Sequence, residues 1–468
     1  MRDLAIQVVR RLQSQNFIAF WAGGCVRDIL MGESPKDYDI ATNATPSEVI
    51  NLFPGSVTVG KAFGVVRAPV ENSWFEIATF RKDHAYKDGR RPEKVSFTDP
   101  TTDANRRDFT INAMFYDPTT DKLHDYVGGR ADIAARSVRC VGKPDERFHE
   151  DHLRMLRAIR FAASLDFSLH HDTAEAIRKH ASSIAGVSAE RIQEEFTRIL
   201  LEARRPGDAL VLMDDLGILE VILPEVTAMK GQAQPSEFHP EGDVFKHTIM
   251  MLNMMKAPAP STPDRSGGQS DTSAPSQSEG LAVSSSHEAS RFPMGSGMEA
   301  SDIARLAYAV LFHDAGKPLT ARVSAERIRF NGHAEQGAEL ANKILRRLHF
   351  SSDDIEVITY CIRNHMRLMD VRNMKRSTLR RLIGAATFRI ELELHRLDCL
   401  ASHGDLSNYR FLVNFQKQLA EEPVLPKPWV TGHDIMELGV SEGPQVGAWR
   451  KKTYDAQLNA GYNRVMKF

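Results

Sequence analysis

The first 140 residues alternate between two patterns of apolar positions. Apolar side chains recur at every second position, or in short continuous runs, in FIAFWA, VTVGKAFGVVRAPV, SWFEIATF, KLHDYV and SVRCVG. Such runs are typical of β-strands, whose successive side chains point to opposite faces. Between them, the helical period appears in CVRDILMG, TPSEVINLF and DFTINAMFY. The mixture predicts a small α/β domain.

Beyond Asp145 the strand pattern stops and helical spacing takes over. Apolar positions follow a period near 3.6 in HEDHLRMLRAIRFAASL, DTAEAIRKHASSI, SAERIQEEFTRILLEA and PGDALVLMDDLGIL. A second helical region begins near His239 and continues to about Glu421. The order of patterns predicts an α+β chain, with a mixed α/β head followed by all-α domains.

Composition divides the helical part further. A segment at about 257–298 is rich in Ser, Pro and Gly and holds few large apolar residues, so it cannot bury enough surface to offset its ordering entropy. We expect it to be a disordered insertion. The Pro-rich EEPVLPKPWV then precedes a last short helical segment. The predicted domains are 1–145, 146–232, 233–420 and 421–468.

Bulk properties exclude few functions. A chain of 468 residues is too long for one core, and its net charge of −1 means that a nucleic-acid site must be a local patch. The four cysteines lie far apart and form no CxxC pair, which favours a reducing compartment. We find no signal-peptide pattern and no apolar run of the roughly 18 residues that span a bilayer. These features predict a cytoplasmic protein that does not contact membranes.

Two aspartates carry the first candidate chemistry. If KDYDIAT forms a strand, Asp37 and Asp39 lie on one face and Tyr38 on the other. Paired carboxylates suit Mg²⁺, which also binds substrate phosphates, and two such ions can activate a hydroxyl and stabilise a leaving pyrophosphate. A lone DxD is common in polar turns, so the neighbouring residues decide its meaning.

Phosphate-binding features flank this pair. Gly23 and Gly24 allow close backbone approach to a triphosphate, and Arg27 follows at a predicted helix start. In RRDFTINAM, Arg107 offers a fork that matches phosphate oxygens and Asp108 an acceptor for a ribose hydroxyl. An RRD triplet alone is more often a solvated surface.

A third polar set lies in EDHLRMLRAIRF. At helical spacing Asp151, Arg154 and Arg157 share one face. An acid and an arginine three residues apart usually form a surface salt bridge. Beside a nucleotide, they would instead offer an acceptor and a donor fork to a base edge.

Residues 17 to about 225 resemble the class II tRNA nucleotidyltransferase and bacterial poly(A) polymerase family. The resemblance is carried, in order, by GGCVRDILMGESPKDYDIAT, FEIATFRKDHAYKDGRRPEKVSF, RRDFTINAM, DYVGGRADI, EDHLRMLRAIRFA and ERIQEE. It implies a polymerase-β-like nucleotidyltransferase head and a helical body that selects the nucleotide and binds tRNA.

The resemblance also implies roles for single residues. Catalytic Mg²⁺ ions would be bound by Asp37 and Asp39, with Glu76 as a further carboxylate near them. The incoming nucleotide would be contacted by Gly24, Arg27, Arg107 and Asp108. Cytosine or adenine would be selected by Asp151, Arg154, Arg157 and Arg160. One departure is His152, where most relatives are expected to carry proline.

A second constellation combines histidines and aspartates in helical surroundings. A lone helical histidine is usually a core or surface residue, but an adjacent His-Asp followed by Gly-Lys, as in LFHDAGKP, is a much rarer combination. About residues 239 to 405 resemble the HD phosphohydrolase superfamily. The resemblance implies core metal ligands at His247, His313, Asp314 and Asp398, with His333 and His365 bringing in a second metal. Such donors suit a divalent transition metal such as Mn²⁺, Fe²⁺ or Ni²⁺. The implied activity is that of a phosphatase or 2′,3′-cyclic phosphodiesterase.

Three functions remain open at this point. The leading hypothesis is a template-independent RNA polymerase that adds CCA to the 3′ end of tRNA from CTP and ATP. An enzyme that adds only A, to tRNA ending in CC or as a poly(A) tail, would share the same motifs. A third possibility is an HD phosphohydrolase whose first domain only binds RNA. The presence of both Asp37 and Asp39 argues against it, because a binding relic needs neither.

Overall fold

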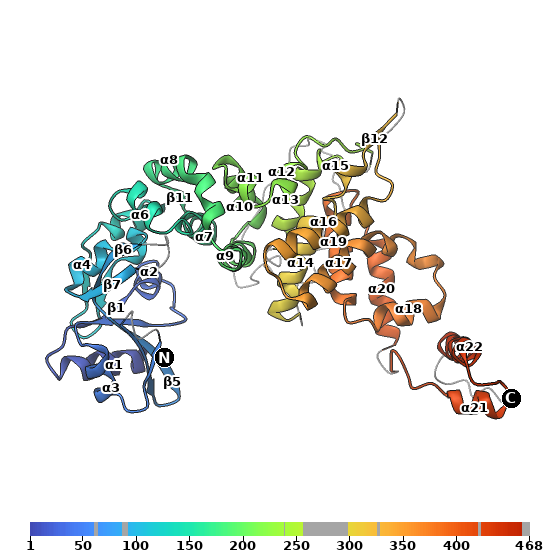
Figure 1. The fold of residues 1–468 in the computed structure, drawn as a ribbon, viewed down its shortest axis with the longest axis horizontal. Coiled ribbons are helices and arrows are strands. Elements are labelled where there is room, and N and C mark those ends of the chain that lie inside the picture. Colours follow the sequence, from blue (N-terminus) through green and yellow to red (C-terminus); the bar gives the residue numbers. More distant parts are fainter. Residues whose placement is uncertain are drawn as a thin grey trace, which may run out of the picture. The chain divides into compact units, whose positions relative to one another are not determined.

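A computed structural model describes residues 1–59, 64–86, 92–237, 239–255, 298–324, 328–419 and 423–460. The chain divides into two compact units, Met1–Pro224 and Glu225–Phe468 (Figure 1). The predicted disordered insertion lies, but for its last residue, outside the described residues. The predicted domain boundaries stay predictions, and each unit is described separately below.

A seven-stranded mixed sheet forms the centre of the first unit. Its strand order is β3-β4-β5-β2-β1-β8-β9, and β2 runs parallel to β5 while the other pairs are antiparallel. The strands are β1 (Ala19–Ala22), β2 (Asp39–Thr42), β3 (Val57–Val59), β4 (Val65–Val70), β5 (Ser73–Thr79), β8 (Phe115–Asp117) and β9 (Lys122–His124). A separate antiparallel hairpin consists of β6 (Arg81–Tyr86) and β7 (Pro92–Phe97).

Short helices pack around this sheet: α1 (Arg2–Gln13), α2 (Gly24–Leu30), α3 (Pro46–Leu52), α4 (Pro100–Asn105) and α5 (Gly129–Ala134). In α1 the buried residues Ala5, Val8, Val9 and Leu12 recur at helical spacing, so this stripe faces the core. Helix α3 begins at a capping box, in which the Thr45 side chain accepts from the Glu48 backbone and Glu48 bonds back. These packed helices hold β1 and β2, which carry the first candidate site.

A helical body completes the first unit. Its helices are α6 (Pro144–Glu150), α7 (Arg154–Leu165), α8 (His171–His180), α9 (Ala189–Glu202), α10 (Pro206–Asp215) and α11 (Ile218–Ile222). Helices α7 and α9 pack together through apolar stripes such as Leu156 and Ile159 against Phe196 and Ile199. Their polar faces are thereby left to line a cavity beside the head.

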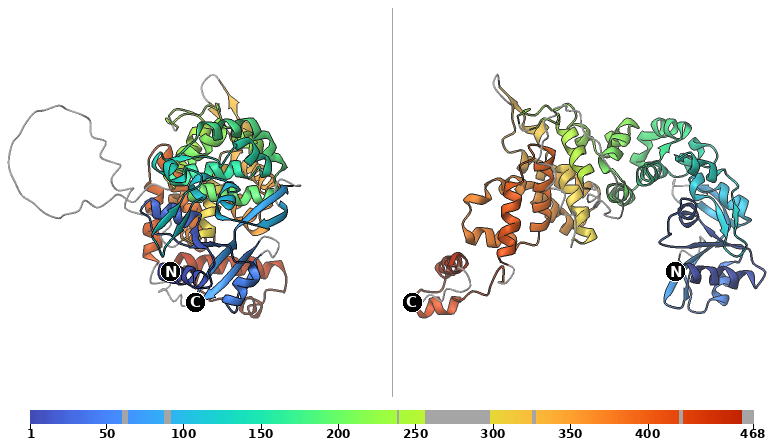
Figure 2. Two further views of the ribbon diagram at one scale, coloured as in Figure 1. Left: turned by 90° about the vertical axis from the view of Figure 1, so that its left-hand side faces the viewer. Right: turned by 180° about the vertical axis from the view of Figure 1, so that it is seen from behind.

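Over the residues that are described, the regular elements of the second unit are helices, apart from one hairpin of two short strands with two residues each (Figures 1 and 2). Its elements are α13 (Val244–Met254), α14 (Ala300–Phe312), α15 (Lys317–Thr320), β12 (Arg322–Val323), β13 (Ile328–Arg329), α16 (His333–Arg347), α17 (Ser352–Asn364), η5 (His365–Asn373), α18 (Arg376–Ile383), α19 (Phe388–Ala401), α20 (Ser407–Gln418), α21 (Gly432–Glu437) and α22 (Pro444–Ala460). All seven residues from Leu306 to Phe312 are buried, so α14 forms the centre of a bundle with α13, α17 and α19.

The predicted α+β architecture is confirmed, with three local corrections. DFTINAMFY is no α-helix: a 3₁₀ turn, η2 (Thr110–Asn112), leads into β8, because Phe115 pairs with Ala22 in the sheet. Strands do not stop at Asp145, since β10 (Ser137–Val138) pairs with β11 (Ser168–Leu169). Asp151 lies between α6 and α7, so it shares no helix face with the arginines that follow. In the described chain, no helix is long and apolar enough to cross a membrane.

Two candidate active sites

The first site is built on the turn that joins β1 to α2. Gly23 has φ +75°, a left-handed conformation that glycine adopts without strain. A Cβ at this position would lie 3.5 Å from Nη1 of Arg107 and 3.8 Å from Oδ2 of Asp39. The bare glycine therefore keeps a polar pocket open in front of the first turn of α2, and it brings backbone close to whatever that pocket binds.

Three carboxylates gather at the edge of this pocket. Asp37 and Asp39 are exposed and flank the buried Tyr38, but β2 begins only at Asp39, so Asp37 and Tyr38 precede the strand that the sequence predicts for this segment. Burial raises the pKa of Asp39 above its ordinary value, and the nearby charges of Glu76 and Asp37 raise it further against the opposing effect of Arg107. Crowded carboxylates of this kind are stabilised by a bound cation, and their hard oxygen donors fit Mg²⁺.

Two arginines of the head also line this pocket, and each is fixed by its neighbours. Nη1 of Arg27 donates to the Asn112 side chain at 2.8 Å, and its other nitrogens bond Asp28. Nη1 of Arg107 donates to the Asn112 backbone oxygen at 3.2 Å, while its Nε donates to the buried Asp103 at 3.1 Å. These bonds fix the direction of both guanidiniums and leave further donor positions for an anion.

The helical body contributes a set of ion pairs. Asp108 accepts two bonds from Arg157, at 2.9 and 2.6 Å. Burial alone would raise the pKa of Asp108, but the guanidinium of Arg157 holds it below the ordinary value. Asp151 is bound in a bidentate pair by Arg191, with bonds of 3.2 and 2.7 Å. Arg154 is paired with Glu150. Each predicted base-selecting or ribose-contacting group is therefore held in a defined direction.

Arg160 differs from the other arginines. It is 3% exposed and its nitrogens bond Glu195 and Glu202. Its guanidinium also lies over the Phe161 ring, 4.3 Å from the centroid. This environment satisfies Arg160 within the protein and makes it a support for α9 as well as part of the cavity lining.

Ten residues predicted for this site line one cavity of about 1060 Å³ in the first unit, and Glu76 is not among its lining residues. They are Gly24, Arg27, Asp37, Asp39, Arg107, Asp108, Asp151, Arg154, Arg157 and Arg160. Sequence reasoning missed the residues that orient them. These are Asp103, Asn112, Glu150 and Arg191; the last three lie within the quoted RRDFTINAM, EDHLRMLRAIRFA and ERIQEE segments, and Asp103 lies just before the first of them.

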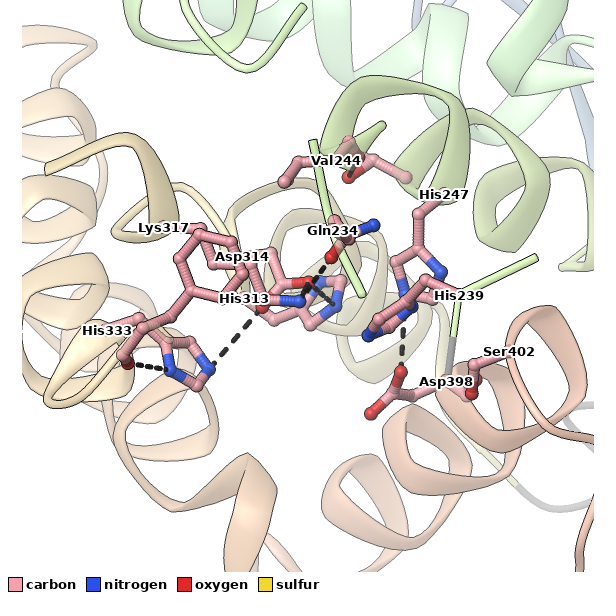
Figure 3. Close-up of polar contacts among 12 residues, drawn as sticks. Gln234, His239, Val244, His247, His313, Asp314, Lys317, His333, Asp398 and Ser402 are labelled. Atoms are coloured by element: carbon pink, nitrogen blue, oxygen red, sulfur yellow. Dashed lines mark hydrogen bonds and ion pairs between the residues drawn. The ribbon is translucent and has the colours of Figure 1, made fainter. Parts of the chain in front are cut away.

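The second site lies in the helical bundle of the second unit (Figure 3). His247 on α13, His313 at the end of α14 and Asp398 on α19 bring one potential ligand atom each within 4.8 Å of the others. A second such group consists of Asp314, His333 and His365. All six predicted ligands thus fall into two adjacent groups.

The hydrogen bonds of the imidazoles define which nitrogens are available. Nδ1 of His313, His333 and His365 donates to the backbone oxygens of residues 310, 330 and 362, at 2.9, 2.8 and 2.7 Å. A carbonyl oxygen only accepts, so each Nδ1 carries a proton and Nε2 is the nitrogen left to bind a metal. The Nε2 atoms of His333 and His365 lie 3.2 Å apart. In neutral rings that donate through Nδ1, both Nε2 atoms would present lone pairs there, an arrangement that a bound cation would stabilise.

The carboxylates near the imidazoles and the pKa values of two histidines also fit metal binding by these two groups. Nε2 of His247 and of His313 are buried, each 3.2 Å from a carboxylate oxygen but without the geometry of a hydrogen bond. Burial lowers the pKa of His365 to about 4, so its ring stays neutral, as a ligand must. Burial alone would lower the pKa of His247, but its contacts with Asp398 and Glu241 raise it to about 9. A metal would replace that proton.

The same site has partners that sequence reasoning missed. Lys317 donates to Asp314 at 2.7 Å and to Gln234 at 2.5 Å, and Glu241 contacts His239 and His247. A cavity of about 1040 Å³ opens beside the ligands. Its lining includes Gln234, His239, Asp314, Lys317, His333, His365, Asp398, Ser402 and His403. Glu241 and Lys317 lie in the segments HPEGDVFKHT and HDAGK, which also contain the predicted ligands His247, His313 and Asp314.

Three family models match this chain. The poly(A) polymerase head domain covers residues 19–139, and the model described as "Probable RNA and SrmB- binding site of polymerase A" covers 166–230. The HD domain model covers 285–393. The matches follow the order of the two candidate sites along the chain.

Similar proteins carry one name. A CCA-adding enzyme of Enterococcus faecalis is 42% identical over 204 residues, which are 43% of this chain and 50% of that protein. One of Bacillus licheniformis is 38% identical over 269 residues, 55% of this chain and 67% of that protein. This chain therefore spans about half to two thirds of the length of the curated relatives it matches. The CTP complex of the Bacillus stearothermophilus CCA-adding enzyme has the same fold, with a TM-score of 0.68, 22% identity, and coverage of 98% and 93% of the two chains.

Proposed function

The chain belongs to the CCA-adding enzyme family, and from this premise we propose that it adds C, C and A to the 3′ end of tRNA without a nucleic-acid template. The observation that carries the proposal is one cavity whose lining combines the exposed carboxylates Asp37 and Asp39, a glycine turn and seven arginines. Such a cavity suits a metal-bound triphosphate and a base that is read by protein side chains.

In this proposal the head holds the reacting groups. Asp37 and Asp39 hold Mg²⁺, which when bound activates the 3′-hydroxyl of the RNA and stabilises the charge of the leaving pyrophosphate. Arg27 and Arg107 bind the triphosphate oxygens, and their bonds to Asn112 keep both guanidiniums aimed at the pocket. The turn at Gly23 lets the backbone at the start of α2 approach the same phosphates.

The helical body chooses the nucleotide. Asp151 offers carboxylate oxygens to an exocyclic amino group, and Arg154 offers donors to the acceptors of a base edge. Their ion pairs with Arg191 and Glu150 reduce the number of directions in which they point. Cytosine and adenine present different arrangements of hydrogen-bond donors and acceptors. A small shift of the Asp151 and Arg154 side chains would therefore change which base they match.

An extension assay on the purified protein with Mg²⁺ tests this function. The substrates are one tRNA that lacks CCA and one that ends in CC, each with labelled CTP, ATP or both. Incorporation of two C and then one A supports CCA addition. Addition of A alone to the CC-ending substrate makes the protein an A-adding enzyme, and long A tails make it a poly(A) polymerase.

A second activity is favoured by the metal-fitting groups of the other unit. The facing Nε2 atoms of His333 and His365 and the buried Nε2 of His313 support a site for a divalent transition metal such as Mn²⁺ or Ni²⁺. We infer a phosphohydrolase that acts on phosphomonoesters or 2′,3′-cyclic phosphates. When bound, the metal supplies an activated water for attack on phosphorus. The protein holds the ligands and offers Lys317, with its charge, at the cavity wall.

Hydrolysis of a chromogenic phosphodiester and of 2′,3′-cyclic AMP, measured with Mn²⁺, Ni²⁺ or Mg²⁺, tests this activity. Turnover that depends on a transition metal supports it. Turnover without any nucleotide addition would make the chain an HD phosphohydrolase whose first unit only binds RNA.

We further place this function in the cytoplasm. All four cysteines are described, and each is free and buried. Burial raises the pKa of Cys25, Cys140 and Cys399 to about 12, so these thiols stay protonated and unreactive. Buried free thiols are typical of proteins that work in a reducing compartment.

A further inference from the structure

One carboxylate lies behind two histidines of the second site. Oε1 of Glu241 accepts from Nδ1 of His247 at 2.6 Å and from Nδ1 of His239 at 2.9 Å. The Glu241 side chain is only 5% exposed. A single carboxylate oxygen therefore fixes the orientation of both imidazoles.

The chain is shaped to put this carboxylate there. Asp243 caps α13 by accepting from the Lys246 backbone at 2.8 Å, and its other oxygen accepts from the Gly231 backbone at 3.1 Å. Gly242 has φ +123°, which turns the chain just before the cap. Glu241 thus reaches the ring of His247, which is one turn inside the helix. Both ends of the turn are anchored, so the carboxylate has a defined position.

His239, Glu241 and His247 also lie close enough to be a third metal-binding group. The hydrogen bonds of His247 argue against a third metal site at these residues. His247 gives Nδ1 to Glu241 and turns Nε2 towards His313 and Asp398. A metal on the Glu241 side would have to take Nδ1 as well and make one imidazole bridge two cations. A carboxylate that accepts from the far nitrogen of a metal-binding histidine instead fixes its tautomer and raises its basicity.

We propose that Glu241 is the positioning residue of the second site, holding His247 so that Nε2 binds the metal. The proposal rests on the phosphohydrolase site inferred above and assigns a role that the ligand set alone does not contain. The charge of Glu241 matters as well as its shape, because its buried Oε2 has no hydrogen-bond partner among the described residues. A buried negative charge that is satisfied on one side only is stabilised by a nearby cation.

Direct metal binding tests this role without relying on activity. We would titrate full-length, metal-free protein with Mn²⁺ by calorimetry, comparing wild type with Glu241→Gln and Glu241→Ala. Glu241→Ala is expected to lose about 10–100-fold in affinity at one site, the range for removing such a partner. Glu241→Gln keeps an acceptor but no charge, so we expect an intermediate loss. The site formed by Asp314, His333 and His365 is expected to keep its affinity.

Two controls and a spectrum separate positioning from folding. Glu225→Gln removes a charge from an exposed ion pair with Arg347 in the same unit, and His239→Ala leaves the bond from Glu241 to His247 in place. Both are expected to bind Mn²⁺ within about threefold of wild type. The visible absorption of the Co²⁺-loaded protein is expected to change in Glu241→Gln, because the basicity of one ligand changes.

Two results would overturn the proposal. One is equal Mn²⁺ affinity in wild type and Glu241→Gln with a loss only in Glu241→Ala that follows its melting temperature, since that describes a space-filling residue. The other is an equal loss in His239→Ala, which would mean that Glu241 does not act through His247. Absence of phosphohydrolase turnover, with these affinities as expected, would refute the proposed second activity and leave the role of Glu241 standing.

Discussion

The two candidate sites hold charge in opposite ways. Asp37 and Asp39 stand exposed just before and at the start of β2, the central strand of the sheet, and offer oxygen donors. His313 and Asp314 are 1% and 2% exposed in the centre of a helical bundle, among further imidazoles. The first arrangement would leave room for substrate oxygens around a bound ion, which suits Mg²⁺. The second would surround a divalent ion with protein ligands, which suits a metal that stays bound.

The positive groups differ in the same sense. The first site surrounds its carboxylates with arginines, each already paired with an acid or an amide, as Arg157 is with Asp108. Preformed pairs reduce the reorganisation that a nucleotide must cause, and the unused donors remain for it. The second site has Lys317, which is 6% exposed and bonded to the ligand Asp314. The comparison indicates one site built for an exchanging, highly charged substrate and one built for a resident cation.

The largest effect is expected from the exposed carboxylates. Asp37→Ala or Asp39→Ala should reduce nucleotide addition by about 10³-fold or more, the equivalent of about 4 kcal/mol, because the metal loses a ligand. RNA binding should stay within a few fold, measured by fluorescence anisotropy. The melting temperature should not fall, because removal of one crowded carboxylate relieves repulsion. Asp3→Ala, at an exposed position of the same unit, is the matched control. Addition at the wild-type rate would refute the metal role.

A loss of similar size is expected at the other site, confined to the other activity. His313→Ala with Asp314→Ala removes one ligand from each metal group, so phosphohydrolase turnover should fall below detection. Nucleotide addition, measured on the same samples, should be unchanged. His433→Ala, which alters an exposed histidine of the second unit, is the control. A parallel loss of addition would show that the two units are coupled and would break the comparison.

How far the sequence predicts these sites depends on whether the signal is local. The sequence predicts opposite exposure for Tyr38 and its two aspartate neighbours, and Tyr38 is buried between exposed Asp37 and Asp39, although β2 itself begins only at Asp39. The order of strands does not follow from any local pattern, because β2 pairs with β5 across more than thirty residues. Phe115 shows the same limit of local patterns. The sequence around it has helical spacing, but Phe115 lies in a strand because it pairs with Ala22.

The supporting residues were missed for a related reason. Arg191 bonds Asp151 across 40 positions, and Asn112 bonds Arg27 across 85. Such residues have no spacing that marks them, since only the folded chain brings them to their partners. Motif residues are recognisable because their chemistry repeats at short range. The side chains that orient them become visible only through tertiary contacts.

An intermediate effect, on stability, is expected at Arg160. Glu195→Ala leaves a guanidinium that is 3% exposed with Glu202 as its remaining carboxylate partner. Breaking a buried pair in this way should cost about 3 kcal/mol and lower the melting temperature of the first unit by roughly 6–12 °C. Glu194→Ala, at the exposed neighbouring position, should change it by less than about 2 °C. Differential scanning calorimetry resolves the transition. An unchanged midpoint would mean that Arg160 needs no internal partner and is free for the nucleotide.

The smallest effect is expected on the selection between CTP and ATP, and less on the rate of nucleotide addition. It tests most directly whether the arginines of the first site read the base. Arg154→Ala removes a charged donor from the cavity wall, and hydrogen bonds of this type contribute about 1.5–3 kcal/mol. We expect the ratio of kcat/KM for CTP and ATP to change about tenfold, while total addition falls less than in Asp37→Ala. Arg178→Ala removes an arginine of an exposed ion pair in the same unit and should leave the ratio unchanged. An unchanged ratio in Arg154→Ala would shift base selection away from α7, and the arginine wall would then bind phosphate without reading the base.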